Sequence, residues 1–94
     1  MTERSALEFP EKIENYDSDR DVILFVGKAA DGEITCAISG EALDDHFAAR
    51  GRGQRARLAA FREHRSEIED AARRKLEASQ QERDGSILIR SYDL

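Results

Sequence analysis

The stretch VILFVGKAADGEITCAIS, Val22 to Ser39, contains two apolar runs on either side of Asp31-Gly32. Asp-Gly is a preferred two-residue loop between antiparallel strands, so the stretch predicts a β-hairpin. With this loop, the expected cross-strand pairs are Ala30–Glu33, Gly27–Cys36 and Phe25–Ile38.

The alternation of side chains along the hairpin divides them between two faces. One face is entirely apolar and is predicted to be buried; it consists of Ile23, Phe25, Ala29, Ile34, Cys36 and Ile38. The other face is only half apolar and consists of Val22, Leu24, Val26, Lys28, Thr35 and Ala37. Because monomers rarely expose large apolar patches, we expect Val22, Leu24 and Val26 to be covered. Either the first twenty residues fold over them or they form an interface with a partner subunit.

Two helices are predicted after the hairpin. Ser39 is placed to cap a short helix that begins at Gly40. A longer helix is expected from about Gln54 to Ala78, with an apolar stripe on one side and charged residues on the other. The expected ion pairs on its charged side, at four-residue spacing, are Glu69–Arg73 and Asp70–Arg74.

Further strands are expected near both ends of the chain, around Leu7 and Phe9 and in the segment SILIRSYDL, Ser86–Leu94. The strands and helices are segregated along the sequence, which is typical of an α+β protein. We therefore predict a single domain over residues 1–94. It has an antiparallel β-sheet, in the sequence order β-β-β-α-α-β, with two helices packed on one face.

Composition limits the classes of function. The net charge is -5 and the sequence pI about 5.0, which argues against general nucleic-acid binding because phosphate contacts need positive charge. The single cysteine, Cys36, has no partner for an intramolecular disulfide and favours a reducing, cytoplasmic location. We find no signal-peptide pattern and no apolar stretch long enough for a membrane span.

The segment RGRGQRAR carries the one local excess of positive charge, at Arg50, Arg52, Arg55 and Arg57. Its two glycines allow the backbone to approach an anion, and a helix N-terminus follows. It is therefore a candidate anion-binding or nucleic-acid-binding segment. The alternative is that Asp44, Asp45 and solvent neutralise the arginines.

Other reactive residues do not form a recognisable motif. Cys36, His46 and His64 lie on separate predicted elements, without the closely spaced ligand pairs that zinc sites usually have. Cys36 is expected to be buried as a small hydrophobic residue, and His46 to lie at the edge of the core. We predict no metal, no cofactor and no catalytic residues, and hence no enzymatic activity.

Several blocks resemble one family of small bacterial proteins, known as domain of unknown function 1488. They are LEFP near the start, VILFV, DGEITCAISGEALDDHF, AAFREHRSEIEDAARRKLE and ILIRSYDL at the end. The resemblance covers nearly the full chain and implies a compact α+β fold. It implies no activity, and the basic RGRGQRAR segment departs from the family pattern.

The sequence thus predicts a small cytoplasmic protein that acts as a non-enzymatic interaction or regulatory module. The expected partner is another protein or a second copy of the chain, with Val22, Leu24 and Val26 at the interface. The alternative is anion or nucleic-acid binding through residues 50–57.

Overall fold

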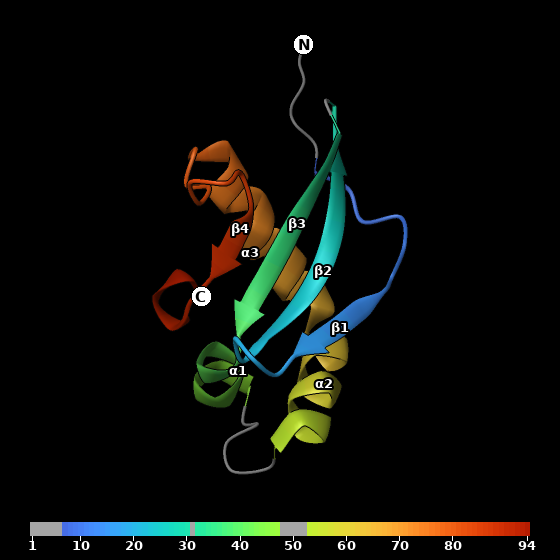
Figure 1. Ribbon diagram of the computed structural model, residues 1–94, viewed down its shortest axis with the longest axis vertical. Helices are drawn as coiled ribbons and strands as arrows, with labels where there is room; N and C mark the ends of the chain where they lie inside the picture. Colours follow the sequence, from blue (N-terminus) through green and yellow to red (C-terminus); the bar gives the residue numbers. More distant parts are fainter. Residues whose placement is uncertain (1–6, 31, 48–52) are drawn as a thin grey trace.

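Figure 1 shows the computed structural model, which describes residues 7–30, 32–47 and 53–94. Its elements in chain order are β1 (Glu14–Asp17), β2 (Val22–Ala29), β3 (Gly32–Ser39), α1 (Gly40–Phe47), α2 (Gly53–Glu63), α3 (Arg65–Glu77), β4 (Ile87–Ile89) and the 3-10 helix η1 (Ser91–Asp93). The strands form one layer in the order β1-β2-β3-β4, and α2 and α3 lie behind it in Figure 1. The structure confirms the predicted α+β fold with helices packed on one face of the sheet.

The central hairpin has a different register from the predicted one. Lys28 pairs with Glu33 and Ala29 with Gly32, so Ala30 lies beyond the last pair of the ladder and the predicted pair Ala30–Glu33 is wrong. Gly32, with φ +135°, adopts a backbone conformation that suits glycine and takes a paired position instead of a loop position. Each residue pairs with a partner two positions away from the predicted one. Side chains alternate between the faces at every residue, so a shift of two residues leaves each side chain on its predicted face.

The two outer strands also refine the prediction. β4 runs parallel to β3, so the sheet is mixed and not purely antiparallel. A parallel neighbour is reached because the chain crosses through the helices before it returns to the sheet. On the other edge β1 pairs with β2, whereas the predicted strand around Leu7 and Phe9 makes a single bridge, between Glu8 and Lys28.

The helical region begins as predicted and then divides. The Ser39 hydroxyl accepts a hydrogen bond of 3.1 Å from the Ala42 amide and so caps α1. The predicted single helix from Gln54 to Ala78 is instead two helices, because His64 leaves the helical conformation with φ -110° and ψ 24°. At this point the His64 ring stacks on Phe47 of α1, with 4.3 Å between the ring centroids.

The core lies between the sheet and the helices. We call the sheet surface that meets the helices the inner face; its fully buried side chains are Ile23, Phe25, Cys36, Ile38, Ile87 and Ile89. Phe25 lies between Phe61 of α2 and Phe9, at centroid distances of 5.2 and 5.7 Å. No helix in the described part of the chain combines the length and apolar character that a membrane crossing needs.

Candidate functional site

The opposite side of the sheet, which we call the outer face, is formed by the side chains that alternate with the buried ones. In the central strands it comprises Val22, Leu24, Val26, Lys28, Glu33, Thr35 and Ala37, and in β4 it includes Leu88. Val22 and Ala37 are buried, Leu24 is half-buried, and Val26 is 40% exposed. No helix of the described residues covers this face, which is turned toward the viewer in Figure 1.

The N-terminal segment packs on the other side. Leu7 and Phe9 are buried in the core, and both lie directly against Gly27 on the inner face. A Cβ atom added at Gly27 would lie 2.7 Å from Leu7 Cδ1 and 2.9 Å from Phe9 Cε1. The sequence predicts that either the N-terminal residues or a partner subunit covers the outer face. Residues 7–20 do not fold over it.

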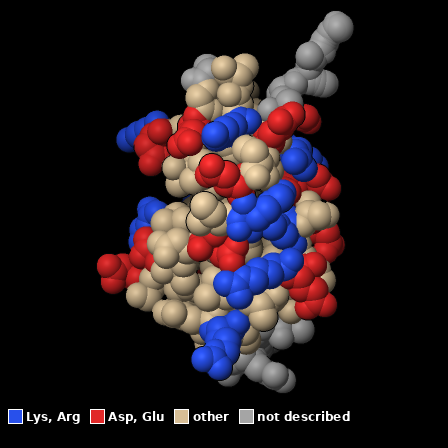
Figure 2. Space-filling view, turned by 90° about the vertical axis from the view of Figure 1, so that its right-hand side faces the viewer, with Lys and Arg blue, Asp and Glu red and all other residues tan. Residues whose placement is uncertain are grey.

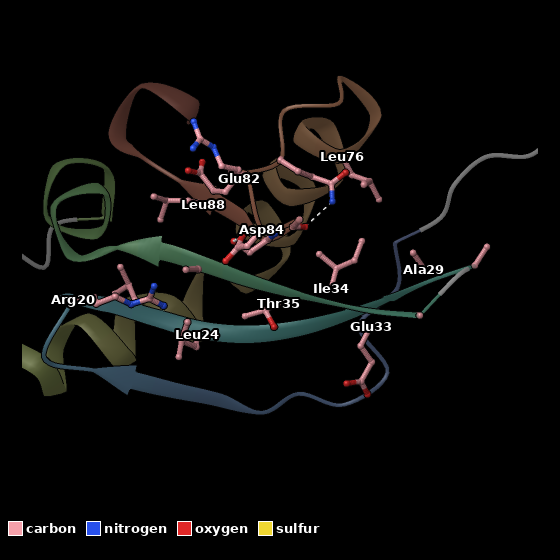
Figure 3. A pocket seen from close by; sticks show the side chains of 18 residues that line it. Arg20, Leu24, Ala29, Glu33, Ile34, Thr35, Leu76, Glu82, Asp84 and Leu88 are labelled. Carbon is pink, nitrogen blue, oxygen red and sulfur yellow. Dashed lines mark hydrogen bonds between the residues drawn. The ribbon is translucent and has the colours of Figure 1, made fainter.

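A groove of about 1300 Å³ runs along the outer face and around the edge of β3. Figure 3 shows it between the central strands and the segment that precedes β4. Its apolar lining includes Leu24, Ile34, Ala37, Leu76 and Leu88. Small-molecule pockets usually have volumes of about 300–1,000 Å³, so this groove has room for a larger ligand such as a peptide.

The far wall of the groove is a turn held by its own hydrogen bonds. The Glu82 amide donates to the Ser86 carbonyl at 2.7 Å, and the Gly85 amide donates to the Glu82 carbonyl at 2.9 Å. Asp84 accepts hydrogen bonds from the hydroxyl and amide of Ser86, which lower the pKa of its carboxyl group. The wall therefore presents carboxylate charge to the groove at neutral pH.

The predicted arginine segment is only partly described. Arg50 and Arg52 lie outside the described residues, and Arg55 is exposed on the first turn of α2. Arg57, in contrast, points into the fold and donates to Asp44 at 3.0 and 2.6 Å, to Asp21 at 2.6 Å and to the Tyr16 hydroxyl at 2.6 Å.

These contacts give Arg57 a structural role. The hydrogen bonds to Asp44 raise the pKa of Arg57 further above its already high value, so the guanidinium stays charged. Its five N–H donors are largely taken by neighbouring side chains, which leaves little capacity for an external anion. For Arg57 the structure therefore supports neutralisation by Asp44. Anion binding by the other three arginines stays a prediction.

The candidate nucleophile and metal ligands are not assembled into a site. Cys36 is fully buried on the inner face, and burial raises the pKa of its thiol to about 12. His46 Nε2 lies 2.8 Å from the Ser91 carbonyl oxygen, whereas His64 Nδ1 lies 2.7 Å from Glu67 Oε1. Among the described residues, no group of three or more His, Cys, Asp or Glu side chains is placed to hold a metal ion.

The ion pairs made by α3 differ from the predicted ones. Glu69 pairs with Arg65 at 2.9 Å and with Lys12 at 3.2 Å instead of the predicted Arg73. Asp70 pairs with Arg73 at 2.8 Å, so the predicted pair with Arg74 is also wrong. Three-residue and four-residue spacings both bring helix side chains together, so spacing alone does not choose between them.

Charges elsewhere on the surface are mixed. Figure 2 shows the side of the molecule that carries β1 and α2, where Lys and Arg side chains lie among Asp and Glu side chains. The pairs Arg62–Glu14 and Arg65–Glu14 belong to this edge of the sheet. On the visible side acidic side chains therefore border the basic ones, whereas a nucleic-acid-binding surface usually shows a continuous basic patch.

The fold and the groove define a class: a small α+β protein whose described residues form a four-stranded sheet with helices on one face and a groove on the other. The chain belongs to the family described as "Protein of unknown function (DUF1488)", whose family model matches residues 7–89. This confirms the resemblance seen in the sequence.

Two bacterial relatives carry the same name. The chain is similar to "Uncharacterized protein YrdB" of Escherichia coli (strain K12), with 31% identity over 84 residues that make up 89% of this chain and 95% of the relative. It is also similar to "Uncharacterized protein YrdB" of Shigella flexneri, with 36% identity over 67 residues, 71% of this chain and 75% of the relative.

A crystal structure supports the fold. A protein of unknown function from the same family, from Shewanella loihica PV-4, superimposes with a TM-score of 0.79. The alignment covers 94% of this chain and 96% of the other, at 24% sequence identity. Both chains therefore share the same fold.

Proposed function

We propose that this bacterial protein is a non-enzymatic interaction module of the cytoplasm, which binds a protein partner through the outer face of its sheet. The observation that carries the proposal is the one-sided covering of the sheet. The α-helices of the described residues and the N-terminal segment from Leu7 leave the outer face open, although it carries the apolar side chains of Leu24, Val26 and Leu88.

The physical argument rests on the cost of leaving apolar groups in water. Burial of apolar surface contributes about 25 cal/mol per Å², and large uncovered apolar patches on small proteins usually mark binding surfaces. The groove adds shape to this surface, because Leu24 and Leu88 line a hollow and not a flat plane. A partner that fills the hollow would bury both side chains.

The reactive side chains support a binding role over catalysis. With a pKa of about 12, the Cys36 thiol is protonated at neutral pH, and it lies inside the core. Nucleophilic cysteines instead have lowered pKa values and are reachable by substrate. A buried, unpaired thiol is also compatible with the reducing cytoplasm.

In-cell photo-crosslinking tests the proposal. Benzoylphenylalanine is placed at Val26, on the outer face, and at Tyr92 as the control, because Tyr92 in η1 is exposed but does not line the groove. We expect position 26 to give one dominant crosslinked protein that position 92 does not give. The same crosslink should be lost when Leu24→Glu places a charge beside the probe.

A crosslink to a second copy of the chain would identify the protein as a homodimer that uses this face. Identical crosslinking patterns at the two positions, or no crosslink at position 26, would contradict the proposal. Circular dichroism of purified Leu24→Glu must show a folded protein, and Thr35→Glu, at the exposed position directly opposite Val26, serves as the second variant.

A further inference from the structure

The edge of β3 is only partly occupied. β4 pairs with Cys36, Ala37 and Ile38, near the end of the strand. On the same side, residues Gly32–Thr35 have no neighbouring strand among the described residues. We call these four residues the free edge.

Alternate residues of the free edge have their amide and carbonyl groups turned away from β2. The Lys28 amide and carbonyl are both hydrogen-bonded to Glu8, at 2.7 and 2.9 Å, on the β1 side of β2. The pair Lys28–Glu33 is therefore a pair without hydrogen bonds in the antiparallel ladder. It follows that the amide and carbonyl of Glu33, and by alternation those of Thr35, point outward along the free edge.

The neighbouring segment does not occupy these groups. Before β4 the chain turns back on itself, with Glu82 bonded to Ser86 and the Gln81 side chain bonded to the Gly85 carbonyl at 2.6 Å. The second of these bonds is drawn in Figure 3. The groove therefore separates the turn from the free edge, and a ligand in it would meet main-chain donors and acceptors at strand spacing.

The groove also offers a place for an apolar side chain. Ile34 and Leu76 are both half-buried and line the part of the groove beside the free edge. Figure 3 shows these two side chains near the hairpin end, with Leu76 from α3 above Ile34. In an extended peptide every second side chain points to the same face, so one of them would reach this position while its neighbours face outward.

We propose that the free edge is the binding site for an extended segment of a partner protein that carries alternating apolar and basic side chains. This inference rests on the proposed function and names the kind of partner. The segment adds a short strand beside Glu33 and Thr35 and continues the line of β4. Main-chain hydrogen bonds then supply affinity, and the position at Ile34 and Leu76 supplies selectivity, as in other cases of strand addition.

Charge favours a basic segment. The groove is lined by the carboxylates of Glu33, Glu82 and Asp84 and by the guanidinium groups of Arg20 and Arg83. Arg20 is already paired with Asp17 at 3.2 Å and Glu82 with Arg90 at 3.3 Å, which leaves Glu33 and Asp84 opposite Arg83, and the whole chain has a net charge of -5. Complementary charge speeds association and suppresses wrong partners, so an acidic segment is disfavoured.

The same consideration argues against a second copy at this site. Two free edges paired with each other would bring Glu33 of both chains to one short ladder, and like charges facing each other are destabilising. A partner with lysine or arginine at the outward positions instead pairs with these carboxylates. The inference therefore names a heterologous peptide segment.

The test uses the full chain and a blocked decapeptide of alternating valine and lysine, with the valine–glutamate decapeptide as its control. Calorimetry measures binding to wild type, Thr35→Pro and Thr35→Ala. Proline removes the outward amide at an edge position, whereas alanine keeps it. We expect the proline variant to lose about tenfold in affinity, as loss of one hydrogen bond implies, and the alanine variant to stay within about twofold.

Amide hydrogen exchange by NMR gives a second measurement, which does not depend on a variant that folds. We expect the amides of Glu33 and Thr35 to become protected when the valine–lysine peptide is added. The Ile34 amide, which points to β2, should be equally protected with and without peptide. Protection that alternates along the strand is specific to strand addition.

The proposal is overturned if the valine–lysine peptide does not bind at millimolar concentration, or if the proline and alanine variants bind it alike. It is also overturned if sedimentation shows a dimer that Thr35→Pro dissociates, because a second copy would then occupy the edge. If Leu24→Glu loses the crosslinked partner and Thr35→Pro keeps it, the outer face is a binding surface but the free edge is not the binding site. Retention of the partner in both variants would reject both.

Discussion

The two faces of the sheet are made by the same strands but have opposite surroundings. Phe25 and Val26 are adjacent in β2, yet Phe25 is fully buried under the helices and Val26 is 40% exposed. The inner face meets α2, α3 and the segment around Leu7, whereas the outer face borders the groove and is covered by no helix of the described residues. The comparison separates two tasks: the inner face stabilises the fold, and the outer face remains available for binding.

Alternation in a strand makes this division possible. A sheet with helices on both faces would need nearly continuous apolar strands, whereas a one-sided sheet needs only every second side chain to be apolar. β2 has an intermediate pattern, because Val22, Leu24 and Val26 are apolar on the uncovered side as well. A protein partner bound to the outer face would bury these additional apolar side chains.

The largest expected effect is on the inner face. Phe25→Ala removes a ring that packs against Phe9 and Phe61 and leaves a cavity, so we expect the free energy of unfolding to fall by about 4 kcal/mol. The matched change on the outer face, Val26→Ala, should cost less than about 1 kcal/mol, because that side chain already contacts water. Urea denaturation followed by circular dichroism measures both values. Similar losses at the two positions would mean that the outer face is also packed in the free protein.

A smaller loss is expected from the buried ion pair between α3 and the C-terminal segment. The Lys75 ammonium donates to Asp93 at 2.8 Å and to the Leu88 carbonyl at 2.9 Å, and the two charged side chains are only 8% and 12% exposed. Asp93→Asn leaves the buried ammonium without its counter-charge. We expect the free energy of unfolding to fall by about 3 kcal/mol, measured by urea denaturation at pH 7. The exposed Asp84→Asn is the control.

The same pair predicts a dependence on pH. Burial by itself would raise the pKa of Asp93, but the hydrogen bonds from Lys75 and from the Arg90 amide outweigh it and lower the pKa. A lowered pKa contributes stability above the unfolded-state value of about 3.9, and this contribution is lost as the pH falls through the folded-state value. The difference in stability between wild type and Asp93→Asn should therefore shrink below about pH 4. An unchanged difference at pH 3 would show that the carboxylate is not the stabilising group.

The sequence was sufficient for the features that depend on local pattern. Alternation predicted both faces of the hairpin, and Ser39 was correctly assigned as the cap of α1. The burial of Cys36 followed from its place between Ile34 and Ile38. These features depend on residues that are near neighbours in the chain, so the pattern contains the needed information.

Features that depend on contacts between distant segments were missed. The break at His64 coincides with stacking on Phe47 of another helix, which no periodicity reveals. The parallel pairing of β4 depends on the path of the chain behind the sheet, and Arg57 turns inward because Asp21 and Asp44 converge on it. The free edge of β3 likewise exists only because β4 is short and the turn before it bends away.

A smaller stability effect than that of Asp93→Asn is expected at Gly27, where the N-terminal segment lies against the inner face. An alanine Cβ would lie 2.7 Å from Leu7 Cδ1, and overpacking of this kind costs about 2 kcal/mol. Replacing a strand glycine by alanine recovers up to about 1 kcal/mol, so we expect a net loss of about 1 kcal/mol for Gly27→Ala in urea denaturation.

A double-mutant cycle shows whether Leu7 is the cause of this loss. If Gly27→Ala is destabilising because of the close contact, Leu7→Ala should relieve it, and the double variant should be more stable than the sum of the single losses predicts. The control pair, Gly27→Ala with Leu24→Ala on the outer face, should be additive, because the two side chains lie on opposite sides of the sheet. A stabilising effect of Gly27→Ala alone would show that Leu7 and Phe9 do not cover the inner face. The N-terminal segment would then be a competing occupant for the outer face.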